Sequence, residues 1–133
     1  MRGRTRLVLL FCFLACGGCS KEKSTDELIE NLKSPQEGER IVAVRLLPQH
    51  KEDAAHVVPA LIKALKDSQG DVRWSAAIGL GYFGEEAKDA IPALREARRD
   101  RDPRVREAAG VALSRIDPVR FHAPSKSRPA RGQ

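Results

Sequence analysis

Apolar residues in the middle of the chain recur at helical spacing, and the whole pattern repeats at a constant period, as from Leu28 to Leu61 and on to Leu94. Within each repeat they fall on one face of a helix, because their steps of four, five, eight and eleven match a period of 3.6 residues. They are Val72, Ala76, Ala77, Leu80 and Phe83, followed one repeat later by Val105, Ala109, Gly110, Leu113 and Ile116. A gap-free internal period of this length is typical of stacked helical repeats.

Each repeated unit holds a shorter and a longer helical pattern, separated by a turn rich in Asp, Ser, Gly and Pro. The shorter helices are predicted at about residues 25–33, 57–66 and 90–99, and the longer ones at about 39–47, 72–83 and 105–116. Pro59 and Pro92 fall in predicted first turns, where a missing N–H costs little. We therefore predict an all-α fold, a short α-solenoid of about three helical hairpins in residues 24–53, 54–86 and 87–117, whose stacked units share one core.

Polar residues at the turns repeat together with the apolar ones. The repeated residues include Val72-Arg73 with Leu80-Gly81, and Asp102-Pro103 with Val105-Arg106. Over about residues 24–117 the chain resembles HEAT repeats, in the compact variety called PBS-lyase HEAT-like repeats. In that family an Asp of the turn and an Arg of the second helix form a ladder between units, which the resemblance assigns to Asp67, Arg73, Asp100 and Arg106. The first unit has Ser34 and Arg40 and so lacks the acid, as suits a capping repeat.

Residues 1–19 have the pattern of an export signal. Basic residues 1–6 precede the apolar residues 7–15, a stretch too short to span a bilayer as a free helix. Small residues ending at a cysteine resemble the lipobox of bacterial lipoproteins, so we predict lipidation at Cys16, with Cys19 as the alternative. An ordinary signal peptide or a membrane-retained helix stays open as another interpretation. By resemblance to Gram-negative lipoproteins, the lack of a following Asp favours a lipid-anchored protein of the cell envelope, on the periplasmic face of the outer membrane.

The charge of the chain is concentrated at its ends. The full chain has 24 Lys and Arg against 18 Asp and Glu, a net charge of +6. Residues 20–117, the predicted repeat domain, hold 17 basic and 18 acidic side chains, so the domain is nearly neutral and nucleic-acid binding is not expected. Residues 118–133 are rich in proline and basic residues and are predicted to be a disordered tail.

No pattern in the chain predicts catalysis or cofactor binding. Near the first inter-repeat loop, His50 and His56 flank Glu52 and Asp53, but the mixed polarity of a loop explains them better than a metal site does. Five arginines between residues 95 and 104 alternate with acids and suggest a solvated face. The sequence therefore predicts no enzyme, no cofactor, no metal and no small-molecule substrate.

Side chains on the outward face of the longer helices suggest a protein-binding surface. The residues at steps of four line up on each helix, and the only Trp and the only Tyr fall in the central row between arginines. The candidates for partner binding are Ile41, Arg45, Trp74, Ile78, Tyr82, Val111 and Arg115. Aromatic residues surrounded by Arg are typical of interaction hot spots, although Trp74 can equally cover the edge of a small core.

Together these patterns predict a membrane-anchored HEAT-repeat scaffold or adaptor that binds a partner protein on its concave face. The PBS-lyase resemblance implies an alternative, a non-catalytic accessory or chaperone subunit of an enzyme.

Overall fold

The structure, a computed structural model, describes residues 23–121. This part of the chain is helical and contains no strand, which confirms the predicted all-α fold. Its α-helices are α1 (Thr25–Asn31), α2 (Glu37–Leu46), α3 (Ala54–Ala64), α4 (Gly70–Phe83), α5 (Ile91–Ala97) and α6 (Pro103–Ile116). Three 3₁₀ segments connect the hairpins: η1 (Leu47–Gln49), η2 (Lys51–Asp53) and η3 (Gly84–Ala90).

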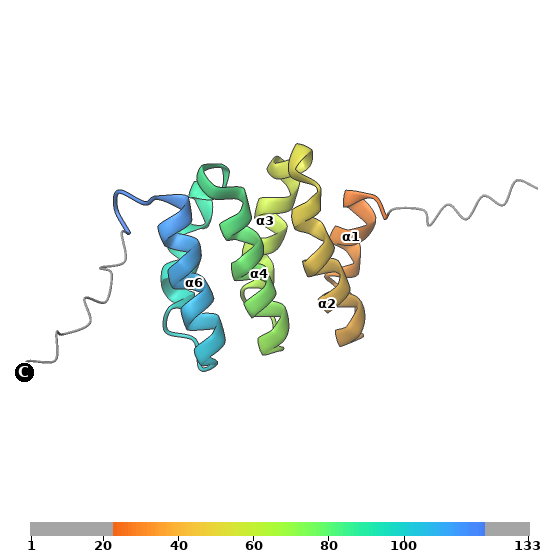
Figure 1. Cartoon of the computed structure of the whole chain (residues 1–133). Helices are drawn as coiled ribbons and strands as arrows, with labels where there is room; N and C mark the ends of the chain where they lie inside the picture. Colours follow the sequence, from red (N-terminus) through yellow and green to blue (C-terminus); the bar gives the residue numbers. More distant parts are fainter. Residues whose placement is uncertain (1–22, 122–133) are drawn as a thin grey trace, which may run out of the picture.

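The helices form two layers. The longer helices α2, α4 and α6 stand side by side in one layer, and α1, α3 and α5 pack behind them (Figure 1). The central helix α4 contacts both of its neighbours in the layer and α3 behind it. The predicted hairpins therefore stack in chain order, with α4 in the middle. Among the described helices, none is long and apolar enough to cross a membrane.

The core repeats with the same period as the sequence. Leucines at two positions of every unit are almost completely buried: Leu28, Leu61 and Leu94 in the shorter helices, and Leu47, Leu80 and Leu113 at or near the ends of the longer ones. Burying one such side chain contributes about 1.5–3 kcal/mol. Because each unit repeats these positions, the core is continuous from α1 to α6.

The longer helices begin two residues earlier than predicted, at Glu37, Gly70 and Pro103. For α6 the reason lies in the polar turn before it, whereas Gln36 and Gln69, at the N-caps of α2 and α4, make no side-chain cap bond. In the third unit the Asp102 carboxylate accepts the backbone N–H of Arg104 at 2.9 Å and so caps the first turn of α6.

The prediction that Pro59 lies in a first turn is wrong, because α3 begins at Ala54 and contains Pro59 in its interior. The 3₁₀ segment η2 leads directly into α3, and Thr25 Oγ1 donates a hydrogen bond of 2.6 Å to Asp53 Oδ2 just before it. Pro59 has no backbone N–H, so it cannot donate the helical hydrogen bond to the carbonyl of Ala55 four residues earlier. Ala55 is exposed, so water can satisfy that carbonyl. Pro92, in contrast, does lie at the start of α5.

Glycines set how closely α4 packs and where it ends. A Cβ on Gly79 would lie 2.8 Å from Pro48 Cγ, and a Cβ on Gly81 would lie 3.2 Å from Ala112 Cα, so both neighbouring units approach α4 where it lacks side chains. Gly84 follows α4 with a φ of 53°, a conformation that favours glycine and ends the helix.

Several predictions fall on residues that the structure does not describe. The export signal, Cys16 and Cys19 lie outside residues 23–121, as does most of the predicted tail. Of the tail, residues 118–121 are described: Phe121 is half-buried against the core, and its N–H donates to the Asp117 carbonyl at 3.0 Å.

Candidate protein-binding surface

A ridge of three side chains on α4 separates two open grooves. Trp74, Ile78 and Tyr82 stand at steps of four along this helix and line both grooves. One groove, of about 520 Å³, lies between α4 and α6. The other, of about 450 Å³, lies between α2 and α4. We call this surface of the α2, α4 and α6 layer the grooved face.

The groove between α4 and α6 contains both residues of α6 that the sequence predicted for partner binding. Val111 and Arg115 of α6 line it together with the ridge. Tyr82 is 59% exposed and Val111 46% exposed, and both are among the few large apolar or aromatic side chains that the described surface leaves uncovered. The groove thus offers apolar contact area, and its lining also includes Arg104, Arg115 and the acid Glu107.

The groove between α2 and α4 contains Arg45 together with the ridge. It is also lined by Ser75, whose buried hydroxyl has no hydrogen-bond partner within the described part of the chain. Ser75 was not among the residues predicted for this surface.

Ile41 was predicted in the same row but lines neither groove. It is partly buried against the core. Its position in α2 corresponds to that of Trp74 in α4, one period later. The isoleucine side chain is much shorter than the tryptophan, which explains why only Trp74 reaches the grooves. The structure therefore groups six of the seven predicted partner-binding residues and leaves Ile41 apart.

Trp74 is flanked by an arginine that the sequence did not assign to this surface. The guanidinium carbon of Arg104 lies 6.0 Å from the centroid of the Trp74 ring, within the range of a cation–π contact. Arg104 also pairs with Asp71 at 2.8 Å and with Asp102 at 2.9 Å. Hydrogen bonds to these acids raise the pKa of Arg104, and the bond from Arg104 lowers the pKa of Asp102. A signal for this contact exists, since Asp71 and Arg104 are one period apart and carry opposite charges.

Two ion pairs join successive units, each between an arginine of one unit and an aspartate of the next. Arg40 Nε lies 2.8 Å from Asp67 Oδ2, and Arg73 Nε lies 2.8 Å from Asp100 Oδ2. In the second pair the side chains are only 7% and 11% exposed. Hydrogen bonding to Asp100 raises the pKa of Arg73, and the same bond lowers the pKa of Asp100.

Within one unit, the ladder arginine binds backbone carbonyls of its own turn and not the aspartate side chain. Arg73 Nη1 donates to the backbone carbonyls of Asp67 at 2.8 Å and Ser68 at 3.0 Å, and Arg40 and Arg106 repeat this bond to the turns of their own units. Each guanidinium is thereby held to its own turn while its other edge faces the next unit. Arg40 thus pairs fully, although its own unit has Ser34 in place of the acid.

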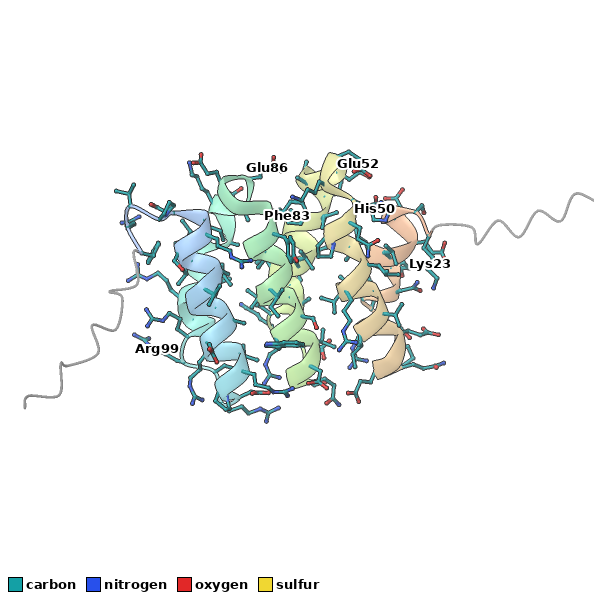
Figure 2. All side chains as sticks on the ribbon, viewed as in Figure 1. Lys23, His50, Glu52, Phe83, Glu86 and Arg99 are labelled. Carbon is teal, nitrogen blue, oxygen red and sulfur yellow. The ribbon has the colours of Figure 1, made fainter. Side chains whose placement is uncertain are left out.

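The loops between units show no arrangement suited to a metal. Within residues 23–121, no group of three or more His, Cys, Asp or Glu side chains is placed to hold an ion. His50 Nδ1 lies 3.5 Å from Glu52 Oε1, and Glu52 is largely exposed. Figure 2 shows Glu52 and Glu86 at the same edge of the stack, on successive inter-unit loops.

The helical repeats of this chain are similar to those of known proteins. A model of HEAT repeats matches residues 25–114. Among solved structures, the chain is similar to the complex of CpcE and CpcF of phycocyanin lyase from Nostoc sp. PCC7120, with 30% sequence identity and a TM-score of 0.65. That match covers 71% of this chain and 37% of the other, so the chain spans well under half the length of this relative. A search of curated proteins finds no match.

One sequence prediction is corrected by this likeness. The sequence predicted no enzyme, because the repeat domain has no cluster of catalytic side chains. The similar structure is a complex of a phycocyanin lyase, and lyases are enzymes. The prediction that the chain is no enzyme is therefore wrong. A short repeat domain without catalytic residues can still resemble a subunit of an enzyme complex.

Proposed function

The chain belongs to the HEAT repeat family, and on that premise we propose that it is a protein-binding subunit of the accessory, lyase-like kind. Its partner protein is held on the grooved face. The likeness to a lyase complex supports the assignment to this kind. The observation that carries the choice of surface is the ridge of Trp74, Ile78 and Tyr82 between two grooves.

The chemistry of the ridge favours a protein over a small molecule as ligand. Aromatic side chains supply a large contact area at low entropic cost, and arginines at the edge pair with acidic groups of the partner. Arg45 stands beside one groove and Arg115 beside the other, whereas Arg104 is already paired with Asp71 and Asp102. A third groove, of about 430 Å³ between α1 and α3, has no Phe, Tyr, Trp or Arg in its lining. The binding surface is therefore assigned to the α2, α4 and α6 layer.

Site-specific photo-crosslinking tests this assignment. A photoreactive amino acid replaces Tyr82 on the grooved face, and in a matched variant it replaces Arg95, an exposed residue of α5 in the opposite layer. Irradiation in cells followed by mass spectrometry should identify a protein joined at position 82 and not at 95. The same protein joined equally well at both positions would contradict a specific role of the grooved face.

A second candidate function is participation in a lyase reaction, and the similar phycocyanin lyase complex favours it. Co-expression with a candidate partner and measurement of chromophore absorbance in the purified complex would separate the two. Absorbance that depends on this chain supports the lyase reaction. A complex without absorbance leaves protein binding as the function.

For location, the proposal rests on the sequence alone. Cys16 is proposed as the lipidated residue, which would anchor the repeat domain in the cell envelope on the periplasmic face of the outer membrane. Two acyl chains would supply the strong anchor that a single chain cannot.

A further inference from the structure

The ladder of arginines continues to the last unit, where the described chain offers it no carboxylate to bind. Arg106 Nη1 donates to the backbone carbonyls of Asp100 at 2.9 Å and Arg101 at 3.2 Å. Arg73 makes the equivalent bonds to its own turn at 2.8 and 3.0 Å. A guanidinium is planar and rigid. These bonds therefore orient the Nε and Nη2 edge of Arg106 in the same way as the edge with which Arg73 binds Asp100.

We infer that the α6 end of the stack is a second docking surface, which binds a helical-repeat unit of another protein through an aspartate on Arg106. In the structure this end is open: α6 is the outermost helix of its layer (Figure 1), and Arg106 is exposed whereas Arg73 is buried. Within residues 23–121, no carboxylate bonds the Nε and Nη2 edge of Arg106.

The surface around Arg106 carries small residues, as does the side of α4 that faces α6. In α4 the next unit is received by Ala77 and Gly81, which both line the groove toward α6. The residues one period later in α6 are Gly110 and Ser114, of which Gly110 is smaller than Ala77 and Ser114 is larger than Gly81. A Cβ on Gly110 would meet nothing within 4 Å, so this place is open to a neighbour. Ser114 Oγ donates to the carbonyls of Gly110 and Val111 at 3.1 and 3.0 Å. A partner that covers Ser114 would therefore leave no buried hydroxyl without a hydrogen bond.

The charge of Arg106 is complementary to a carboxylate of a partner protein, because its Nε and Nη2 edge bonds no acid of the described chain. Outside the described residues, the given sequence has one acidic side chain, Glu22. A second copy of this chain would present Ser34 where the internal joints present Asp67 and Asp100. The occupant is therefore a repeat unit with an aspartate in the turn before its second helix. At both internal joints that aspartate also accepts a backbone N–H two residues later, at 2.9 and 2.8 Å.

The chain itself offers a defined probe. The turn at Ser34 already has the required shape, because the Gln36 N–H donates to Ser34 Oγ at 3.1 Å, as the Gln69 N–H donates to Asp67 Oδ1 at 2.9 Å. Ser34→Asp combined with Glu39→Val, which supplies the valine that stands buried at Val72 and Val105, should therefore present a carboxylate in the geometry of the internal ladder. Adding Arg106→Gln to the same full-length chain prevents it from binding itself and makes it a donor only. Fluorescently labelled wild-type chain is then titrated with this donor, and binding is followed by sedimentation.

We expect a one-to-one complex of the donor with the wild-type chain. Binding to an Arg106→Gln acceptor should be at least about tenfold weaker, the loss expected for a bidentate charge-assisted contact. An Arg99→Gln acceptor, which changes an exposed arginine elsewhere in the third unit, should bind as the wild type does. Unaltered chain used in place of the donor should bind at least about tenfold more weakly, since it has Ser34.

Absence of binding to the wild-type chain, or equal binding to the Arg106→Gln acceptor, would overturn the inference. Residues 1–22 are the same in all variants, so any association through them cancels in the comparison. Neither outcome bears on the grooved face, because Arg106 lines neither groove. The second docking surface and the proposed function therefore fail or succeed separately.

Discussion

Removal of the Asp100 carboxylate tests how the units are held together. Asp100 accepts hydrogen bonds from Arg73 Nε at 2.8 Å, from Arg73 Nη2 at 2.9 Å and from the Asp102 N–H at 2.8 Å. In Asp100→Ala all three are lost, and a guanidinium that is only 7% exposed is left without its counter-ion. Breaking a buried ion pair in this way costs about 3–5 kcal/mol.

We expect the lower end of this range, about 3 kcal/mol, because Arg73 Nη1 keeps its two carbonyl partners in Asp100→Ala. That is a large share of a total stability of about 5–15 kcal/mol. Urea unfolding followed by circular dichroism measures it. With a urea dependence of about 2 kcal/mol per molar, the midpoint should fall by about 1.5 M.

A second ion pair supplies the control. Lys33 Nζ lies 2.6 Å from Glu30 Oε2, closer than the Arg73–Asp100 pair, but these side chains are 68% and 71% exposed. Exposed pairs contribute little, so Glu30→Ala should cost less than about 0.5 kcal/mol. If Asp100→Ala costs no more than Glu30→Ala, burial of the ladder does not stabilise the stack and the reasoning is refuted.

The same ion pair predicts a pH dependence. Hydrogen bonding to Arg73 lowers the pKa of Asp100 below its ordinary value, so near that value the folded chain binds fewer protons than the unfolded one. The stabilisation is therefore complete above about pH 4, the ordinary Asp value, and is lost as the pH falls through the lower folded pKa. The urea midpoint should fall on acidification more steeply in the wild type than in Asp100→Asn. Parallel curves would contradict the assignment.

The remaining predictions concern packing and the anchor. Leu80→Ala removes a fully buried side chain of the central helix and should cost about 2–5 kcal/mol in urea unfolding; a loss below about 1 kcal/mol would mean that the register of the core is wrong. Gly79→Ala should destabilise the fold by about 1–3 kcal/mol through overpacking, because the alanine Cβ would lie 2.8 Å from Pro48 Cγ. The Cβ of the control Gly38→Ala would meet nothing within 4 Å, so that variant should not be destabilised. Cys16→Ser should abolish lipid labelling and membrane retention; labelling that persists there and disappears only in Cys19→Ser would place the anchor at Cys19.

The sequence predicted what repeats and, apart from the aspartates and arginines of the ladder, missed the contacts that cross between units. The internal period is visible in Leu61 and Leu94, and it was enough to predict the hairpins and their order because each unit buries the same positions. The start of α3 was missed, since Pro59 is a strong local signal for a first turn and the bond between Thr25 and Asp53 that precedes the helix joins distant residues.

The same limit applies to the candidate site. Steps of four along single helices correctly grouped Trp74 with Tyr82 on the ridge, but they assigned Ile41 to the same surface, because helical spacing does not measure how far a side chain reaches. Arg104 beside Trp74 was missed, since that contact crosses from α4 to α6. A comparison of charges one period apart, such as Asp71 and Arg104, would have found it.

The central claim is that the grooved face binds a protein, and affinity together with melting temperature in Trp74→Ala tests it most directly. The partner is the protein crosslinked at position 82. Its affinity for the wild-type chain and for Trp74→Ala is measured well below the melting temperature of both. The account predicts a loss of about 2 kcal/mol or more, the size of a hot spot, with helical content nearly unchanged. A Trp74→Ala chain that melts early but binds the partner with unchanged affinity when folded would contradict it, because Trp74 would then only cover the core.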